Sequence, residues 1–317
     1  MHVPTGTQHE LTLPTPSGLA RVVVTQVAAG LRLYSLNGID LVETFDELVQ
    51  PPMAAGIVLV PWPNRIRDGQ WTQNGVTRQL ALTEPGKHNA SHGLLRFAPY
   101  RAVGQTSDTV TLGATVFPQS GYPFHLETEV TYALTATGLD VTHRVRNVGG
   151  EAAPVAVGAH PFLKIGDVPT GDLVLRVNAA THIEVDERLN PTGETAVDGT
   201  RFDLRGGVKV GDLDLDDGFG GVAGEHTLTA SDGRSVTLWG DETMRYVQVF
   251  TPRIFPVTQA ATEPVRGLAI AIEPMTAPAN AFNSGAGLHW AQPGEQWVVR
   301  WGIRHAGFSR SSRRSRH

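Results

Sequence analysis

The sequence predicts an all-β protein, built as a large antiparallel β-sandwich. Alternating apolar and polar residues recur along the whole chain, and several of these alternations are separated by dipeptides that favour tight hairpin turns. Helical periodicity is nearly missing. The 35 glycines and 21 prolines among the 317 residues are dispersed rather than repeated, which indicates many turns between short strands. Strands at this density favour a sandwich over alternating βαβ units.

Three hairpins are predicted from their turns. The turn dipeptides are Asn37-Gly38, Asn74-Gly75 and Asp232-Gly233. Further strands, most of them rich in β-branched or aromatic residues, are predicted over 126–134, 139–145, 173–177, 235–239, 246–250 and 296–301. One short helix is predicted over 43–49, because acidic residues stand near its start and Pro51 follows its end.

The predicted domain organisation is a single domain over 1–308, followed by a basic tail over 309–317. A turn at 147–150 offers a possible division near Glu151, but no linker and no repeat accompanies it. The tail is rich in serine and arginine. Such a terminus is more typical of a disordered end than of a nucleic-acid-binding arm, so no nucleic-acid partner is predicted.

Composition indicates a soluble globular protein, since 40% of the residues are hydrophobic and 18% are charged. The absence of cysteine from the sequence excludes disulfides and thiolate chemistry. The first ten residues lack the pattern of a secretory signal, and no apolar run is long enough to span a bilayer. We therefore expect a cytoplasmic protein without a membrane partner, either a monomer or a homodimer.

Three short motifs suggest bound ions or cofactors, and all three are set aside. The acidic run over 212–218 lacks the glycine and the closing glutamate of a calcium loop. The glycines over 218–223 are not followed by the helix that a dinucleotide fingerprint needs. His88 and His92 have the spacing of two metal ligands on a helix, yet they lie in a predicted loop. The sequence therefore predicts no metal and no cofactor.

Polar side chains that are suited to ligand binding follow the apolar segment 56–61. Asn64 and Arg65 come directly after Trp62-Pro63. An arginine fork and an amide can hold vicinal hydroxyls, while an indole face can stack on the C–H surface of a sugar ring. An arginine that simply packs on a tryptophan explains the same residues equally well.

An imidazole and a carboxylate follow two other apolar segments. His160 comes after 154–159, and Glu273 comes after 268–272. Partial burial raises the pKa of such a carboxylate toward the working range of a general base. Taken alone, each is more typical of a structural residue, the histidine of a core and the glutamate of a surface ion pair.

Taken together and in order, these segments resemble the aldose 1-epimerase (galactose mutarotase) family, from about residue 56 to 304. Six segments carry the resemblance: Asn-Arg-Ile at 64–66, Ser-His-Gly at 91–93, Ala-His-Pro-Phe at 159–162, Asp-x-x-Phe at 216–219, Tyr-Val-Gln-Val-Phe at 246–250 and Ile-Glu-Pro at 272–274. The residues around them differ from the better-known galactose mutarotases at Pro63, Pro161 and Met275, which is closer to a bacterial branch of less settled sugar preference.

The resemblance implies a mutarotase-like sandwich with an open sugar-binding cleft, and an enzyme that interconverts the α and β anomers of a hexose-like aldose without a cofactor. Its general acid would be His160 and its general base Glu273, acting at the ring oxygen and the anomeric hydroxyl. The residues implied to hold the sugar are Asn64, Arg65, His92, Asp216 and Gln248.

Other functions are compatible with the same residues. A non-catalytic carbohydrate-binding module on this fold needs no acid and base pair. A phosphosugar epimerase needs further cations, for which Arg67 and Lys87 are the candidates. A glycosidase uses two carboxylates, and Glu273 has only Asp216 as a partner in the motif set.

Overall fold

The computed structural model describes residues 3–256 and 265–308, which form two large antiparallel sheets and several smaller ones. The larger sheet has nine strands, in the spatial order β10 (Arg101–Gln105), β11 (Thr109–Val116), β12 (Leu126–Thr135), β13 (Gly138–Asn147), β28 (Gln296–Ala306), β22 (Ser235–Gly240), β21 (Glu225–Thr229), β16 (Val174–Arg176) and β19 (Val208–Lys209). The second has seven strands, in the order β18 (Pro191–Ala196), β17 (Thr181–Val185), β20 (Asp216–Gly220), β23 (Tyr246–Phe250), β26 (Ala271–Met275), β15 (Gly158–Ala159) and β5 (Val58–Leu59).

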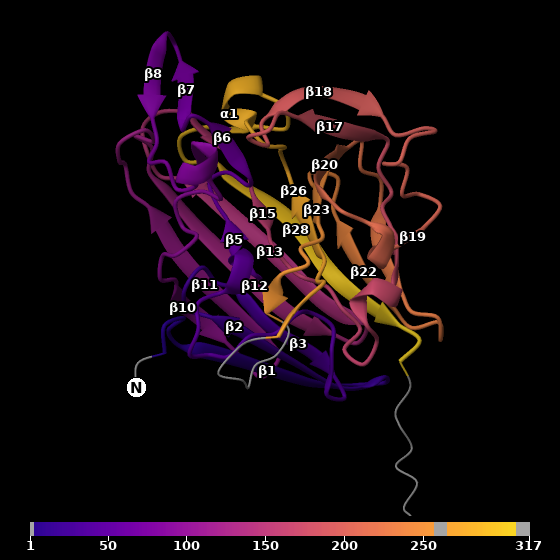
Figure 1. Cartoon of the computed structure of the whole chain (residues 1–317). Coiled ribbons are helices and arrows are strands. Elements are labelled where there is room, and N and C mark those ends of the chain that lie inside the picture. The colour runs from indigo at the N-terminus through magenta and orange to yellow at the C-terminus, as the bar shows by residue number, and fades with distance from the viewer. Residues whose placement is uncertain (1–2, 257–264, 309–317) are drawn as a thin grey trace, which may run out of the picture.

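The smaller sheets lie around these two. The N-terminal one has four strands, β1 (Gln8–Thr15), β2 (Gly18–Thr25), β3 (Leu31–Leu36) and β4 (Ile39–Asp40). The two-stranded ones are β6 (Arg65–Arg67) with β9 (Asn89–Ser91), β7 (Gln70–Gln73) with β8 (Val76–Gln79), β14 (Ala153–Val155) with β27 (His289–Ala291), and β24 (Phe255–Pro256) with β25 (Arg266–Gly267). Figure 1 shows β1, β2 and β3 at one end of the molecule and the β7–β8 hairpin at the other, on the same side as β6, β17 and the short helix α1 (Ala281–Ser284).

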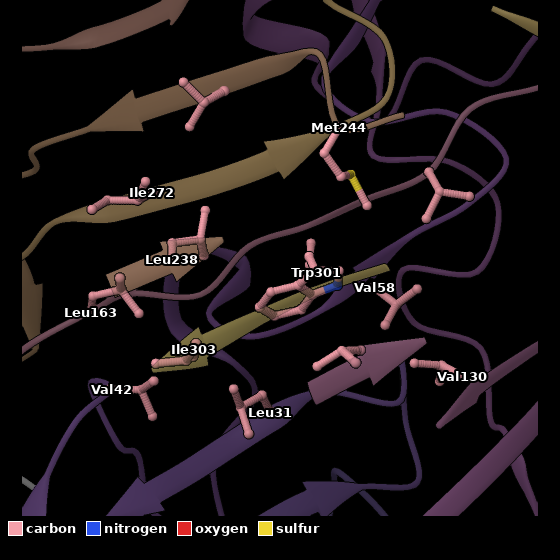
Figure 2. Packing of buried hydrophobic residues seen from close by; sticks show 14 of the residues in the cluster. Leu31, Val42, Val58, Val130, Leu163, Leu238, Met244, Ile272, Trp301 and Ile303 are labelled. Atoms are coloured by element: carbon pink, nitrogen blue, oxygen red, sulfur yellow. The ribbon is translucent and has the colours of Figure 1, made fainter. Parts of the chain in front are cut away.

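The two large sheets share one apolar core. Trp301 on β28 of the nine-stranded sheet and Ile272 on β26 of the seven-stranded sheet belong to the same cluster of buried residues (Figure 2). The Trp301 indole also donates a hydrogen bond of 2.9 Å to Nε2 of His143, which is fully buried on β13. Burial lowers the pKa of His143 to about 3, so its ring stays neutral and can accept this bond. The Trp301 side chain therefore fills part of the core and also links β28 to the neighbouring β13.

The structure confirms the predicted all-β fold and the predicted hairpins. Asn37 and Gly38 join β3 to β4 and Asn74 and Gly75 join β7 to β8, all with positive φ, as a type I′ turn requires. The third predicted hairpin joins β21 to β22. The strand predicted over 246–250 coincides with β23, and the other predicted strands lie within β12, β13, β16, β22 and β28 or overlap them.

The short helix predicted over 43–49 is wrong. All of these residues are described, and none of them is helical. The backbone N–H of Glu43 donates to the carbonyl of Phe162, and the buried Glu43 carboxylate lies 2.9 Å from Nζ of Lys164. Asp46 accepts a hydrogen bond from the N–H of Leu48 and closes a turn instead of a helical start. Tertiary contacts have overridden the local helical signals.

Two further predictions concern the C-terminal tail and membrane-spanning segments. The basic tail predicted over 309–317 lies outside the described residues. In the described ranges, no helix combines the length and the apolar character that crossing a membrane takes.

Gly93 provides a test of this packing, because a side chain there would have no room. Its φ is +75°, and a Cβ would lie 2.1 Å from the carbonyl oxygen of Val60. Gly75 has nearly the same φ, +76°, with nothing within 4 Å of a Cβ, so it is a matched control. Gly75→Ala should lower the free energy of unfolding by about 1–2 kcal/mol, the cost of a left-handed backbone.

Gly93→Ala should lower the free energy of unfolding by at least about 2 kcal/mol more than Gly75→Ala does, because the Val60 backbone must move. Urea unfolding of the two variants measures the difference. Equal losses in the two variants would contradict the close approach.

Candidate functional site

Three neighbouring strands of the seven-stranded sheet bring polar side chains to one face. Gln248 on β23 lies opposite Glu273 on β26 and opposite Gly218 on β20. Asp216 stands two residues before Gly218 and therefore shares this face. A Cβ on Gly218 would lie 3.2 Å from the Gln248 side-chain oxygen, so the glycine leaves the room that the amide occupies. Register and alternation together place Asp216, Gln248 and Glu273 side by side.

The neighbouring carboxylate of Asp217 belongs to the opposite face. Its Oδ1 lies 2.7 Å from Nε2 of His182, and the His182 ring stacks on Phe202 at 3.5 Å between centroids. Its Oδ2 accepts a hydrogen bond from the N–H of Asp216. The choice of Asp216 over Asp217, which the motif implied, thus agrees with the way the strand alternates.

Asn64 and Arg65 complete a set of polar contacts with Asp216 and Gln248. Asn64 Nδ2 donates to Gln248 Oε1 at 3.1 Å, and Gln248 Nε2 donates to Asp216 Oδ1 at 2.8 Å. Arg65 Nη2 lies 3.6 Å from Asp216 Oδ2, and Arg65 Nη1 donates to Asn64 Oδ1 at 3.4 Å. Residues that are far apart in the sequence are therefore held in one closed ring of contacts, which we call the polar ring.

The backbone around β6 explains how His92 joins this group. Arg65 on β6 pairs with Ser91 on β9, and the N–H of His92 donates to the carbonyl of Asn64 at 2.8 Å. Both Asn64 and His92 have positive φ, 54° and 63°. The chain therefore turns sharply at both positions, just outside the paired strands.

A small pocket adjoins the polar ring. All four ring residues line it, together with Gly218 and five apolar side chains, those of Ile183, Val185, Leu189, Met275 and Ala279. Polar groups and an apolar wall in one cavity suit a ligand with both hydroxyls and C–H surface.

His160 and Glu273 form a buried imidazole and carboxylate pair beside the ring. His160 Nε2 lies 3.3 Å from Glu273 Oε1, and the side chains are 5% and 3% exposed. His160 follows β15, where its N–H donates to the carbonyl of Ile57 and its own carbonyl accepts from Gly56. In the described part of the chain, neither His160 Nδ1 nor Glu273 Oε2 has a hydrogen-bond partner.

Burial shifts the two pKa values of this pair in opposite directions. Burial, and then the nearby charge of Arg65, lower the pKa of His160 to about 4. Burial and the charge of Asp216 raise the pKa of Glu273 well above its usual range, and Arg65 opposes this rise. These directions favour a neutral imidazole and a protonated carboxyl.

His92 stands next to this pair. Its ring centroid is 5.4 Å from that of His160, at an interplanar angle of 78°. Burial, followed by the charges of His160, Arg65 and Arg96, lowers the pKa of His92 well below its usual range. A neutral ring can both donate and accept a hydrogen bond. Its Nδ1 has no partner among the residues described.

The structure thus brings all seven sequence-predicted site residues into one region, but two details differ from the sequence-based reasoning. Glu273 lies inside β26 rather than at a strand end. Trp62 is only 1% exposed and packs edge-on against Phe282, with ring centroids 5.4 Å apart. It is a core residue and does not offer a face for sugar stacking.

Sequence reasoning missed Glu84 and the apolar wall of the pocket. Glu84 makes two contacts with Arg65, at 2.8 Å and 3.1 Å. No local pattern marks it, because it lies in a loop before the short 3-10 helix over Pro85–Lys87. In the sequence, nothing distinguishes the apolar wall residues from ordinary strand or turn residues.

The two candidate phosphate-binding cations are already engaged with other groups of the chain. Arg67 Nη2 lies 3.3 Å from Asp186 Oδ2, and Lys87 Nζ donates to the carbonyl of Glu187 at 2.7 Å. His88, considered as a metal ligand with His92, contacts Asp68 at the surface while His92 is buried. No three His, Asp or Glu side chains within the described ranges are grouped so as to hold a metal ion.

The arrangement can move protons at a ligand that is held by its hydroxyls. A buried pair with one shared proton can donate at one atom and accept at a neighbouring one. The polar ring offers amide, guanidinium and carboxylate groups that orient hydroxyls.

The sequence of the chain is similar to those of several known proteins. The uncharacterized protein YihR of Escherichia coli K12 is 33% identical over 286 residues, which is 90% of each chain. Human galactose mutarotase is 32% identical over 184 residues, 54% of this chain and 52% of that protein.

Solved structures share the fold at lower identity. An aldose epimerase homologue from C. elegans superimposes with a TM-score of 0.81 at 17% identity, covering 95% of this chain and 99% of the other. A galactose 1-epimerase from Lactobacillus acidophilus has a TM-score of 0.74 at 21% identity, covering 94% of each. The family model described as aldose 1-epimerase matches residues 12–304, and the chain therefore belongs to the aldose 1-epimerase family.

Proposed function

We propose that this protein catalyses the exchange of α and β anomers of a free aldose. One observation carries the proposal: the buried His160 and Glu273 lie 3.3 Å apart, next to the polar ring. The ring oxygen and the anomeric hydroxyl of an aldose are bonded to the same carbon, so an acid and a base this close can reach both. Membership of the aldose 1-epimerase family supports the same reaction.

In the proposed mechanism, the polar ring and His92 hold the sugar while the pair moves two protons. His160 donates a proton to the ring oxygen, Glu273 accepts the proton of the anomeric hydroxyl, and the bond between C1 and the ring oxygen breaks. The open aldehyde rotates about its C1–C2 bond and presents its other face. The C5 hydroxyl then attacks C1, returning its proton to His160, while Glu273 protonates the new anomeric oxygen.

The mechanism needs the pair to carry one proton in total. The opposed pKa shifts of His160 and Glu273 favour this state. The directions of the two shifts favour Glu273 as the group that carries this proton before a sugar binds. We propose that it crosses to His160 when sugar hydroxyls donate to Glu273 Oε2, because such bonds stabilise the carboxylate.

The decisive experiment follows anomer exchange directly. Freshly dissolved anomers of several aldoses, with D-galactose and D-glucose among them, are monitored by NMR at a pH where spontaneous exchange is slow. Acceleration of at least one aldose by the wild-type protein is expected. If none is accelerated, the protein is not a mutarotase, and a carbohydrate-binding module becomes the better description.

Glu273→Gln should lower kcat by roughly a hundredfold or more, because the amide cannot accept the proton of the anomeric hydroxyl. Sugar binding should be largely retained. Glu295 is a matched control, since it also contacts a histidine, His289, at 2.8 Å but near the surface. Glu295→Gln should leave the rate unchanged. A near wild-type kcat in Glu273→Gln would rule out its role as the base.

Asp216→Asn should act mainly on KM, because the proposed role of Asp216 is to hold hydroxyls. Loss of charge-assisted hydrogen bonding is expected to weaken binding by about 1–3 kcal/mol, or roughly 5- to 150-fold in KM. Asp214 is exposed two residues earlier on the chain, and Asp214→Asn is the control. A change in kcat alone would contradict a binding role for Asp216.

The acid limb of the pH profile of kcat/KM should lie near pH 4. Below about pH 4 the pair gains a second proton, since burial has lowered the pKa of His160 to about 4, and no base remains. Above the raised pKa of Glu273 the pair loses its last proton, and no acid remains. Rates measured between pH 4 and 9, after subtraction of spontaneous exchange, test this. Half-maximal activity on the acid side near 6.5, the usual imidazole value, would contradict it.

A further inference from the structure

The guanidinium of Arg65 is held from one side by Glu84. Arg65 Nε lies 2.8 Å from Glu84 Oε2, and Arg65 Nη2 lies 3.1 Å from Glu84 Oε1. These are the two parallel contacts of a bidentate arginine and carboxylate pair, which fixes the plane of the guanidinium as well as its position. The Arg65 side chain is only 14% exposed, so the pair is partly shielded from water.

A second carboxylate lies close to the same nitrogen. Asp216 Oδ2 is 3.6 Å from Arg65 Nη2, which is longer than either contact with Glu84. Asp216 also accepts the hydrogen bond from Gln248. Glu84 and Asp216 therefore compete for one end of the Arg65 fork, and Glu84 has the closer contacts.

The backbone holds Glu84 at this position independently of its side chain. The N–H groups of Thr83 and Glu84 donate to the carbonyl of Asn89, and the N–H of Asn89 donates back to the carbonyl of Glu84. Asn89 begins β9, which pairs with β6, and Arg65 begins β6. Carboxylate and guanidinium thus project from segments that are hydrogen-bonded to each other.

We propose that Glu84 is a positioning residue for sugar binding: it holds Arg65 away from Asp216, so that both keep hydrogen-bonding capacity for the ligand. This inference rests on the proposed function of the site. When Glu84 is replaced by alanine, the guanidinium turns toward Asp216. The arginine and the aspartate then satisfy each other, and a sugar must break their contact before it can bind.

The test is a double-mutant cycle of Glu84→Ala and Asp216→Asn, with KM and kcat measured for the aldose that the wild type converts fastest. Glu84→Ala should raise KM by about tenfold or more and leave kcat nearly unchanged. In the Asp216→Asn background the same change should raise KM much less, because the neutral amide attracts Arg65 weakly. A purely structural role for Glu84 would instead give the same factor in both backgrounds.

A matched control comes from the same strand. Arg67 on β6 pairs with Asp186 at 3.3 Å, with both side chains partly exposed, so Asp186→Asn removes a carboxylate from a neighbouring arginine and leaves the contacts of Arg65 in place. It should leave KM unchanged. Glu84→Gln keeps the size of the side chain and one acceptor oxygen, and it should restore part of the affinity lost in Glu84→Ala. Thermal unfolding of each variant establishes that it folds.

The outcomes separate this inference from the proposed function. An unchanged KM in Glu84→Ala, a loss in kcat alone, or equal factors in both backgrounds overturns the role of Glu84 even if the wild type is an active mutarotase. The dissociation constants for D-galactose and D-glucose, measured by calorimetry, repeat the cycle without turnover. Weaker binding by Glu84→Ala that depends on Asp216 supports the inference even if no aldose is isomerised. A wild type that neither isomerises nor binds any aldose overturns both.

Discussion

The candidate site depends on the register of three paired strands, β20, β23 and β26. Because side chains alternate along a strand, a slip of one residue would turn Gln248 and Glu273 to the other face and bring Val249 and Ile272 to the pocket. The apolar residues between the site residues prevent that slip, since Val249 and Ile272 are buried in the shared core. The packing that stabilises the sandwich is thus also what aligns the polar face.

Charge compensation is the second constraint. Arg65 lies next to the buried Glu273 and His160 and influences the pKa of both. A guanidinium so close to the interior is tolerated because Glu84 and Asp216 flank it, since a buried charge without a partner is strongly destabilising. Glu84 and Asp216, to which a positioning role and a binding role are proposed, therefore also compensate the charge of Arg65.

Patterns of adjacent residues predicted the turns and strands well. The assembly of distant residues into one site was predicted only through the resemblance to a known family. The turn at Asn37-Gly38 and the strand over 246–250 were predictable because the type of a turn and the alternation of a strand depend on residues that are adjacent in the sequence. The prediction of a helix over 43–49 was wrong because Glu43 contacts Phe162 and Lys164, which are distant in the sequence. Glu84 could not be found for the same reason, since only the pairing of β6 with β9 brings it to Arg65.

The depth of the His160 and Glu273 pair has a consequence for proton supply. An acid or base that does not recover its original protonation state within the cycle must exchange a proton with solvent, and a residue as enclosed as Glu273, 2% exposed, would hinder that exchange. In the proposed ring opening and closure, every proton that leaves the sugar returns to it before the product departs. The site needs no proton channel and no buffer molecule, so burial can raise the basicity of Glu273 without slowing its recovery.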